Sequence, residues 1–424
     1  MEKTLRSAVI LGLIVSLGFL VILPSGYATS EPGESVKIGA IFPVTGSLAL
    51  LGEQSFRGAE LARLDQNKKG GLFGKQIEFV KSDAPDAKAA VAEAERLITV
   101  EKMKVILGTY SSSLSAVASE VAERNGVIYW EQGAVADDIT KRGFKYLFRT
   151  APRASDHGIS AVKLVSEVFA PKVGLKVSDV KMAIIYEDSL WGTSQSQFVR
   201  EGAKGLGIKI VADESYSSKA VDLTPLVMRL KQAKPDVIIA TQYANDAVLF
   251  QKQAKELNLY VKAFIGTGGG TNLASFQEAL GPIADGVLNV GFGNMTTNPK
   301  MVPEMGKVLK AYRETYKEEP PSIYPFVNYT GTMFLFDTIK KAGSMEPDKI
   351  RQAAMTMDVP LGKSATGWGL KFAPVGDPNA GQNMRAIIFA EQWQKGRLVT
   401  IYPDAARPSG IEVILPLPPW SKRQ

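Results

Sequence analysis

The residues that most enzymes use for catalysis are scarce in this sequence. It contains no cysteine and one histidine, His157, which follows Asp156 at the start of a predicted helix. Thiolate metal sites and cysteine nucleophiles are excluded, and His157 has no second histidine with which to share a metal. We therefore expect a surface or helix-capping role for His157, no metal and no cofactor.

Motifs for hydrolysis and nucleotide binding are also incomplete. The serine run Ser111, Ser112 and Ser113 lacks the G-x-S-x-G pattern of a hydrolase nucleophile. The glycines from Gly266 onward miss the G-x-G-x-x-G pattern because Thr271 takes the place of the last glycine. Gly362 lacks the glycine five residues earlier that a P-loop requires. An exported hydrolase is thus the weakest alternative.

Binding suits the serine run better than catalysis. Tyr110 to Ser113 directly follow a predicted buried strand, Val105 to Gly108, and open a predicted helix, Ser112 to Arg124. In open α/β sheets ligands bind at this edge, where free N–H groups and the helix dipole attract a carboxylate. Simple N-capping would explain one of the hydroxyl groups, so both interpretations stay open on this pattern alone.

Other predicted strands also end in aromatic, acidic or amide side chains. These residues are Trp130, Glu131 and Gln132, then Glu187, Asp188 and Trp191, and finally Gln242 and Tyr243. They belong to two successive series of strands. Two sheet edges that face one another form an interdomain cleft, which is where small ligands commonly bind.

The elements that must position these residues alternate along the chain. From Val36 to Phe42 onward, short β-branched runs alternate with helical ones, which is typical of parallel βαβ units. In the helix from Ser112 to Arg124, an apolar stripe is formed by Leu114, Val117, Ala118, Val121 and Ala122. A second series follows Arg149 to Ser155. We predict an α/β protein with two doubly wound parallel-sheet lobes.

The last third of the chain has a different pattern. After Gly293 the sequence predicts mainly helices, and then two strands, Arg385 to Gln392 and Leu398 to Tyr402. Prolines from Pro416 to Pro419 cannot continue a regular ladder. We expect a surface tail at this end of the chain.

The first residues read as a secretory leader. Lys3 and Arg6 precede an uncharged apolar run from Ala8 to Leu23, and small residues follow at Gly26 and Ala28. This run is shorter than the roughly 20 residues of a spanning helix. We predict a signal peptide over residues 1–28, cleaved after Ala28, with a retained anchor as the alternative. Either outcome places most of the chain outside the cytoplasm.

Length and charge bear on the number of domains and on nucleic-acid binding. At 424 residues the chain exceeds one ordinary domain. The formal net charge of +7 comes from basic residues scattered among acidic ones, without the aromatic interleaving of a nucleic-acid surface. We expect no nucleic-acid partner.

Taken in order, seven stretches make the chain resemble the type I periplasmic solute-binding proteins of ABC importers, in particular the Leu/Ile/Val-binding group. The stretches are Ile38 to Gly46, Gly52 to Glu60, Gly70 with Gly71, Gly108 to Ser113, Ile139 to Thr150, Asp236 to Leu259 and Phe264 to Asn272. The resemblance implies two lobes joined by a three-stranded hinge, over residues 34–151 plus 293–384 and residues 152–292 plus 385–424. It also implies a periplasmic monomer that is not an enzyme and that delivers its solute to ABC transporter permease subunits.

The resemblance also implies a ligand site between the lobes. Ser112 would hold a ligand carboxylate, with Tyr110, Ser111 and Ser113 beside it. The neighbouring loop would contribute Gly133 and Val135, and the second lobe would contribute Trp191, Tyr243 and Gly268.

Two departures from the family pattern bear on the ligand. Val135 replaces a threonine contact and leaves only a backbone N–H, and Gly268 stands where an acidic residue receives an ammonium group. Glu131 is a candidate for the missing anion. We expect an amino acid or a related small carboxylate or amide. A ligand-sensing receptor ectodomain of the same fold is the alternative.

Overall fold

The structure has two sheets, and the serine run Ser111 to Ser113 follows a strand of the first one. The computed structural model describes residues 35–423, so the predicted signal peptide lies outside the described residues. The five strands of this sheet are parallel and lie in the order β2-β1-β3-β4-β5. They are β1 (Val36–Phe42), β2 (Ile77–Asp83), β3 (Val105–Gly108), β4 (Ile128–Glu131) and β5 (Leu147–Arg149).

The second sheet has seven strands in the order β12-β11-β10-β9-β8-β6-β7. They are β6 (Lys181–Glu187), β7 (Lys209–Tyr216), β8 (Val237–Thr241), β9 (Ala263–Gly266), β10 (Leu288–Gly291), β11 (Phe389–Gln394) and β12 (Arg397–Tyr402). Strands β6 to β10 are parallel, whereas β11 and β12 add an antiparallel edge. The predicted strand from Arg385 begins four residues late, because the Arg385 N–H donates to Asn383 Oδ1 and its carbonyl accepts from the Gly369 N–H, both outside the sheet.

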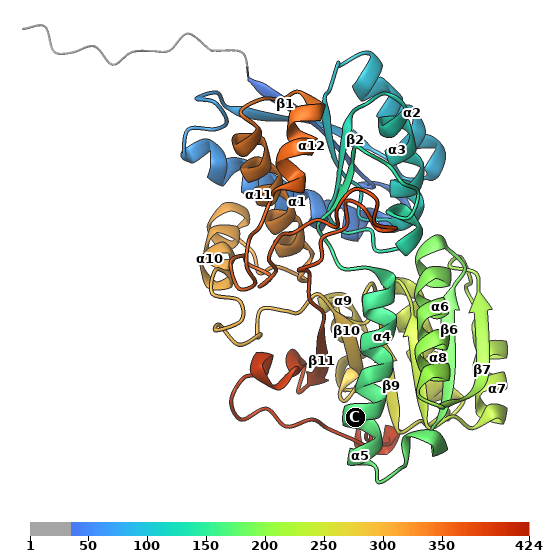
Figure 1. The fold of residues 1–424 in the computed structure, drawn as a ribbon. Coiled ribbons are helices and arrows are strands. Elements are labelled where there is room, and N and C mark those ends of the chain that lie inside the picture. Colours follow the sequence, from blue (N-terminus) through green and yellow to red (C-terminus); the bar gives the residue numbers. More distant parts are fainter. Residues whose placement is uncertain (1–34, 424) are drawn as a thin grey trace, which may run out of the picture. The chain divides into compact units, whose positions relative to one another are not determined.

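Helices from two distant parts of the chain, before residue 125 and after residue 304, cover the first sheet. They are α1 (Ala49–Lys68), α2 (Ala87–Thr99), α3 (Ser112–Arg124), α10 (Met305–Tyr316), α11 (Tyr324–Ala342) and α12 (Pro347–Met355). Figure 1 shows the orange-brown helix α11 beside the blue helix α1, and the two are in contact. Residues near position 330 therefore complete a lobe that begins at β1.

The second sheet is covered by helices from the middle of the chain. They are α4 (Ala154–Leu164), α5 (Ala170–Lys172), α6 (Leu190–Gly205), α7 (Thr224–Ala233), α8 (Ala244–Glu256) and α9 (Ala274–Leu280). The chain passes between the sheets after β5, after β10 and before β11. The fold is thus the predicted pair of doubly wound lobes joined by three crossovers. The residue limits given above for the lobes stay a prediction.

The predicted stripe of α3 faces the core. Leu114, Ala118, Val121 and Ala122 are buried in one hydrophobic cluster, and Val117 packs against it. Burying this stripe against the sheet fixes the direction of α3, so that its first turn begins at the carboxyl end of β3. Core packing therefore positions the serine run.

The last residues do not form the predicted surface tail. Leu417 is buried, and its N–H donates to the Lys262 carbonyl at 2.6 Å. Trp420 Nε1 donates to the Leu259 carbonyl at 2.9 Å. The prolines do break the ladder, but these side chains cover an apolar cluster of the second lobe. Among the described residues, no helix is both long enough and apolar enough to cross a membrane.

Candidate functional site

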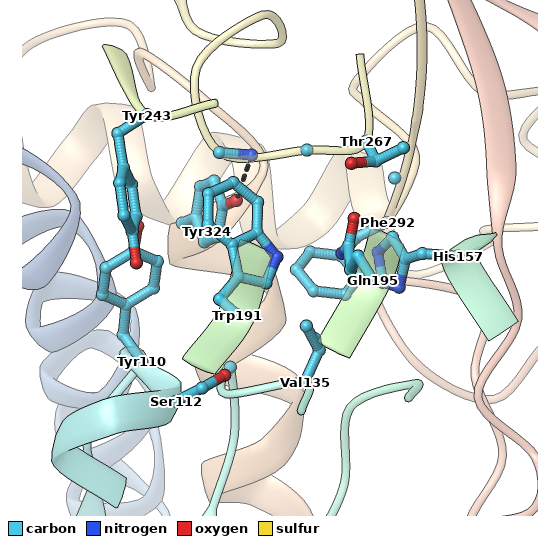
Figure 2. A pocket seen from close by; sticks show the side chains of 14 residues that line it. Tyr110, Ser112, Val135, His157, Trp191, Gln195, Tyr243, Thr267, Phe292 and Tyr324 are labelled. Carbon is cyan, nitrogen blue, oxygen red and sulfur yellow. Dashed lines mark hydrogen bonds between the residues drawn. The ribbon is translucent and has the colours of Figure 1, made fainter. Parts of the chain in front are cut away.

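A pocket lies where the carboxyl ends of the two sheets meet. The cavity inside it measures about 20 Å³, which is room for one or two water molecules. The lining residues are Tyr110, Ser112, Gly133, Val135, His157, Trp191, Gln195, Tyr243, Thr267, Gly268, Gly269, Gly291, Phe292 and Tyr324. Figure 2 shows their side chains converging from both lobes. Seven of the ten predicted site residues are in this set.

The start of α3 forms one end of the pocket. Ser112 is the first helical residue, so the N–H groups of this turn have no partner within the helix. The Ala136 N–H donates to Ser112 Oγ at 3.1 Å, which leaves the hydroxyl proton of Ser112 free to donate. This end therefore offers hydrogen-bond donors, which suit a carboxylate or a carbonyl oxygen.

Tyr110 turns into the pocket because its backbone has a left-handed conformation, with φ +86°. Its ring meets the ring of Tyr324 edge to face, with 5.5 Å between the centroids. Burial raises the pKa of Tyr110 far above its usual value, so its hydroxyl is neutral.

Ser111 and Ser113 do not line the pocket. Both line a neighbouring crevice, together with residues such as Leu50 and Val221. Adjacent residues at the start of a helix point in different directions, because each residue turns the helix by about 100°. The run therefore brings only Ser112 to the pocket.

Glu131 does not line the pocket either. Its side chain is fully buried, and Oε1 accepts from the N–H groups of Gln132, Gly133 and Ala134 at 2.7 to 2.8 Å. Oε2 accepts from the Thr109 N–H at 2.8 Å. The carboxylate thus shapes the loop that presents Gly133, and this placement does not support its predicted role as the anion for an ammonium group.

Aromatic side chains of the second lobe form a wall of the pocket. The rings of Trp191 and Tyr243 lie 4.6 Å apart between centroids. Ser189 caps α6 by accepting from the Trp191 N–H at 3.2 Å, and Glu187 in turn accepts from the Ser189 N–H at 2.8 Å. These bonds hold the start of α6, so they fix the position of the Trp191 ring.

Gly268 has no side chain at the position where the family pattern places an acidic residue, so no carboxylate lies there. Its N–H donates to Asn289 Oδ1 at 3.0 Å, and Asn289 Nδ2 donates to Glu391 at 2.7 Å. Burial raises the pKa of Glu391 to about 7. Within residues 35–423 no acidic side chain lines this pocket, so a ligand ammonium would have no direct carboxylate partner.

His157 is not at the surface as predicted from the sequence. It is buried in α4, its ring meets Phe292 edge to face at 5.2 Å, and it lines the pocket. The sequence placed His157 at the start of a helix, whereas α4 begins at Ala154 and packs against α6. That packing turns His157 inward, which the isolated sequence pattern did not indicate.

Comparison with known proteins supplies the family. A family model described as periplasmic binding protein matches residues 35–404. The chain belongs to the periplasmic binding proteins. The Leu/Ile/Val-binding protein homolog 8 of Brucella abortus is 40% identical over 372 residues, which cover 88% of this chain and 91% of the relative. The resemblance inferred from the seven stretches is therefore confirmed.

Solved structures share the fold. The branched-chain amino acid transporter substrate-binding protein of Streptococcus pneumoniae, in complex with isoleucine, has a TM-score of 0.74 at 24% identity and covers 87% of this chain and 100% of its own. A solute-binding protein of an ABC transporter from R. palustris, in complex with benzoate, has a TM-score of 0.73 at 23% identity, with coverage of 90% and 99%.

Several pocket residues of this periplasmic binding protein were not predicted from the sequence. Thr267, Gly269, Gly291 and Phe292 lie at or just beyond the ends of β9 and β10, so the strand-end rule could have found them. Gln195, His157 and Tyr324 lie on helices, and no strand-end signal marks them.

Tyr324 is the most distant of these residues in the sequence. It opens α11, and its hydroxyl accepts from the Gly269 N–H at 3.1 Å, the dashed line in Figure 2. Only the packing of α11 against α1 brings it to the pocket.

Proposed function

We propose that this protein is the extracytoplasmic substrate-binding component of an ABC uptake system. The proposed ligand is an amino acid or a related small carboxylate or amide, bound in the pocket between the lobes. The relatives support this class of solute. One is named a Leu/Ile/Val-binding protein homolog, and two of the solved structures hold isoleucine and benzoate.

One observation carries the proposal. Donor groups at the start of α3 in the first lobe share a pocket with the rings of Trp191 and Tyr243 from the second lobe. A ligand that touches both lobes favours the state in which they are close together, because only that state offers all the contacts. Closure of the hinge around the ligand is then the signal to the permease subunits.

The groups that line the pocket limit the chemical class of the ligand. A carboxylate fits Ser112 and the free N–H groups of α3, and a flat or apolar portion fits the aromatic wall. We propose a site made of Tyr110, Ser112, Gly133, Val135, Trp191, Tyr243 and Gly268, without Ser111, Ser113 and Glu131.

Binding is favoured over catalysis by the contacts of the two residues that a hydrolase would pair. Ser112 Oγ accepts from the Ala136 N–H, and His157 Nδ1 lies 2.9 Å from the Arg153 carbonyl oxygen. Neither contact is that of a nucleophile with its base. We propose a monomeric binding protein that is not an enzyme.

Export completes the proposal. A leader over residues 1–28 would bring the chain to the periplasm, where the family model places proteins of this kind by name. Amino-terminal sequencing of the exported protein tests cleavage after Ala28, and a mature chain that still begins at Met1 would contradict it.

Mass spectrometry of solute released from freshly purified, denatured protein tests the function directly. We expect a small carboxylate or amide at close to one equivalent, and calorimetry with that solute should then give micromolar or tighter binding, about 8 kcal/mol or more. Ser112→Ala should weaken binding, whereas Ser113→Ala in the same helical turn is the matched control. Release of no solute, together with no binding to amino acids or aromatic acids, would contradict the proposal.

A further inference from the structure

The single histidine is the unexplained polar group of the pocket. Because a carbonyl oxygen only accepts, the contact of His157 Nδ1 with the Arg153 carbonyl at 2.9 Å places the proton on Nδ1. In the neutral ring Nε2 is then a hydrogen-bond acceptor. Burial lowers the pKa of His157, against the opposing influence of its hydrogen bond to the Arg153 carbonyl and of the charges of Asp156 and Asp137, and so favours the neutral ring.

The other polar side chains at this end of the pocket bind one another. With its amide oriented to satisfy both partners, Gln195 accepts from Trp191 Nε1 at 2.9 Å and donates to the Thr267 carbonyl at 3.2 Å. Thr267 Oγ1 lies 2.8 Å from Thr241 Oγ1. Among residues 35–423, no hydrogen bond is found at His157 Nε2, although the residue lines the pocket.

The two ends of the pocket therefore differ in chemistry. Figure 2 shows Ser112 on one side and His157 on the other. The Ser112 end offers donors, whereas the His157 end offers an acceptor. A ligand carboxylate near Nε2 would meet a lone pair instead of a proton, so the carboxylate is directed to Ser112.

We propose that His157 Nε2 accepts a hydrogen bond from an O–H or N–H group of the ligand, at the end of the ligand remote from its carboxylate. His157 is then a specificity-determining residue. It selects hydroxylated or amide-bearing small acids over acids of the same shape that are purely apolar at that end. This inference rests on the proposed function and sharpens its ligand class.

Matched ligand pairs test the selection by calorimetry. Asparagine and leucine have side chains of similar shape, as do 4-hydroxybenzoate and benzoate after allowance for one oxygen, and only the first member of each pair carries the remote donor. We expect the donor-bearing member of at least one pair to bind about tenfold or more tightly, because the apolar member leaves a buried acceptor unpaired.

Two variants separate the acceptor from the ring. His157→Phe keeps a flat ring beside Phe292 and removes Nε2, so the preference within the pair should disappear. His157→Gln keeps an acceptor oxygen and should retain part of the preference. Urea unfolding of each variant shows whether the fold is intact. A preference that survives unchanged in folded His157→Phe overturns the inference.

Nitrogen NMR tests the same inference in the unmodified protein. The chain has one histidine, so the ring spectrum of protein freed of any histidine tag contains a single imidazole. We expect a protonated Nδ1 and a bare Nε2, and the Nε2 resonance should shift more with the donor-bearing ligand than with its apolar analogue. A proton on Nε2 in the free protein overturns the inference.

The outcomes distinguish this inference from the proposed function. If both members of each pair bind equally, or if the solute released from the purified protein has a carboxylate as its sole polar group, the role of His157 fails while solute binding stands. If no probe binds and no solute is released, both fail.

Discussion

Substituting Gly269 by alanine should damage both the pocket and the fold. Gly269 has φ +68°, and a Cβ built on it would lie 2.2 Å from Trp191 Cη2 and 2.7 Å from the Gln242 carbonyl oxygen. Carbon atoms in contact normally stand about 3.5 to 4.0 Å apart, so the Trp191 ring would have to retreat by more than 1 Å. That movement would disturb its contact with Tyr243 and its hydrogen bond to Gln195.

The cost has two parts that a control can separate. A left-handed conformation costs alanine about 1 to 2 kcal/mol, and overpacking adds about 1 to 3 kcal/mol. Gly207 has the same φ of +68°, but nothing lies within 4 Å of its added Cβ. Gly207→Ala should therefore show the first cost alone, and Gly269→Ala the sum of about 2 to 5 kcal/mol.

Urea unfolding followed by tryptophan fluorescence measures the two stabilities, and calorimetry with the released solute measures binding. We expect Gly269→Ala to unfold at lower urea than Gly207→Ala and to bind at least tenfold more weakly than the unchanged protein, while Gly207→Ala binds normally. Equal unfolding midpoints for the two variants, with normal binding in both, would refute the close contact between Gly269 and Trp191.

Three further predictions follow from other contacts. Ser112→Ala and Tyr243→Ala should each weaken calorimetric affinity while the protein still folds, because they remove a donor or a ring from the pocket; unchanged affinity in both contradicts the site. Glu131→Gln should lower the free energy of unfolding by about 2 to 4 kcal/mol, since the amide replaces an acceptor that serves buried N–H groups; a loss below about 0.5 kcal/mol in urea contradicts this. Glu391 has a folded pKa of about 7, above its ordinary value of 4.5, so the native state binds more protons than the unfolded state between these pH values. The free energy of unfolding should therefore fall as the pH rises from about 4.5 through 7, by up to roughly 3 kcal/mol from this group. Glu391→Gln should flatten the plot of the urea-derived free energy of unfolding against pH. An identical plot for the variant contradicts the raised pKa of Glu391.

The elements set by local pattern were the ones that the sequence predicted well. The predicted limits of β1 and α3 coincide with the structure, because a short run of buried β-branched residues and an apolar stripe of period 3.6 are both properties of a short segment. The strand-end rule then placed Ser112, Trp191 and Tyr243 in the pocket. This rule holds because parallel strands bring their carboxyl ends to one edge of the sheet, independently of the length and conformation of the loops.

The residues that the sequence placed incorrectly depend on packing between distant segments. Glu131 ends a strand like the others, but its carboxylate points into its own loop, where four N–H groups converge on it. His157 faces inward because α4 packs on α6, and Tyr324 reaches the pocket because α11 packs on α1. The apolar pattern of a helix shows which of its faces is buried, but it does not show against which other helix that face packs.

Both lobes are completed late in the order in which the chain is made. α11 (Tyr324–Ala342) must return to α1 (Ala49–Lys68), and β11 (Phe389–Gln394) must pair with β10 (Leu288–Gly291). Neither lobe can acquire all its elements before most of the polypeptide has been synthesised. Contacts between such distant segments slow folding. A nascent chain of this kind stays unfolded for longer, which leaves time for a leader such as the one proposed for residues 1–28 to guide it across a membrane before it folds.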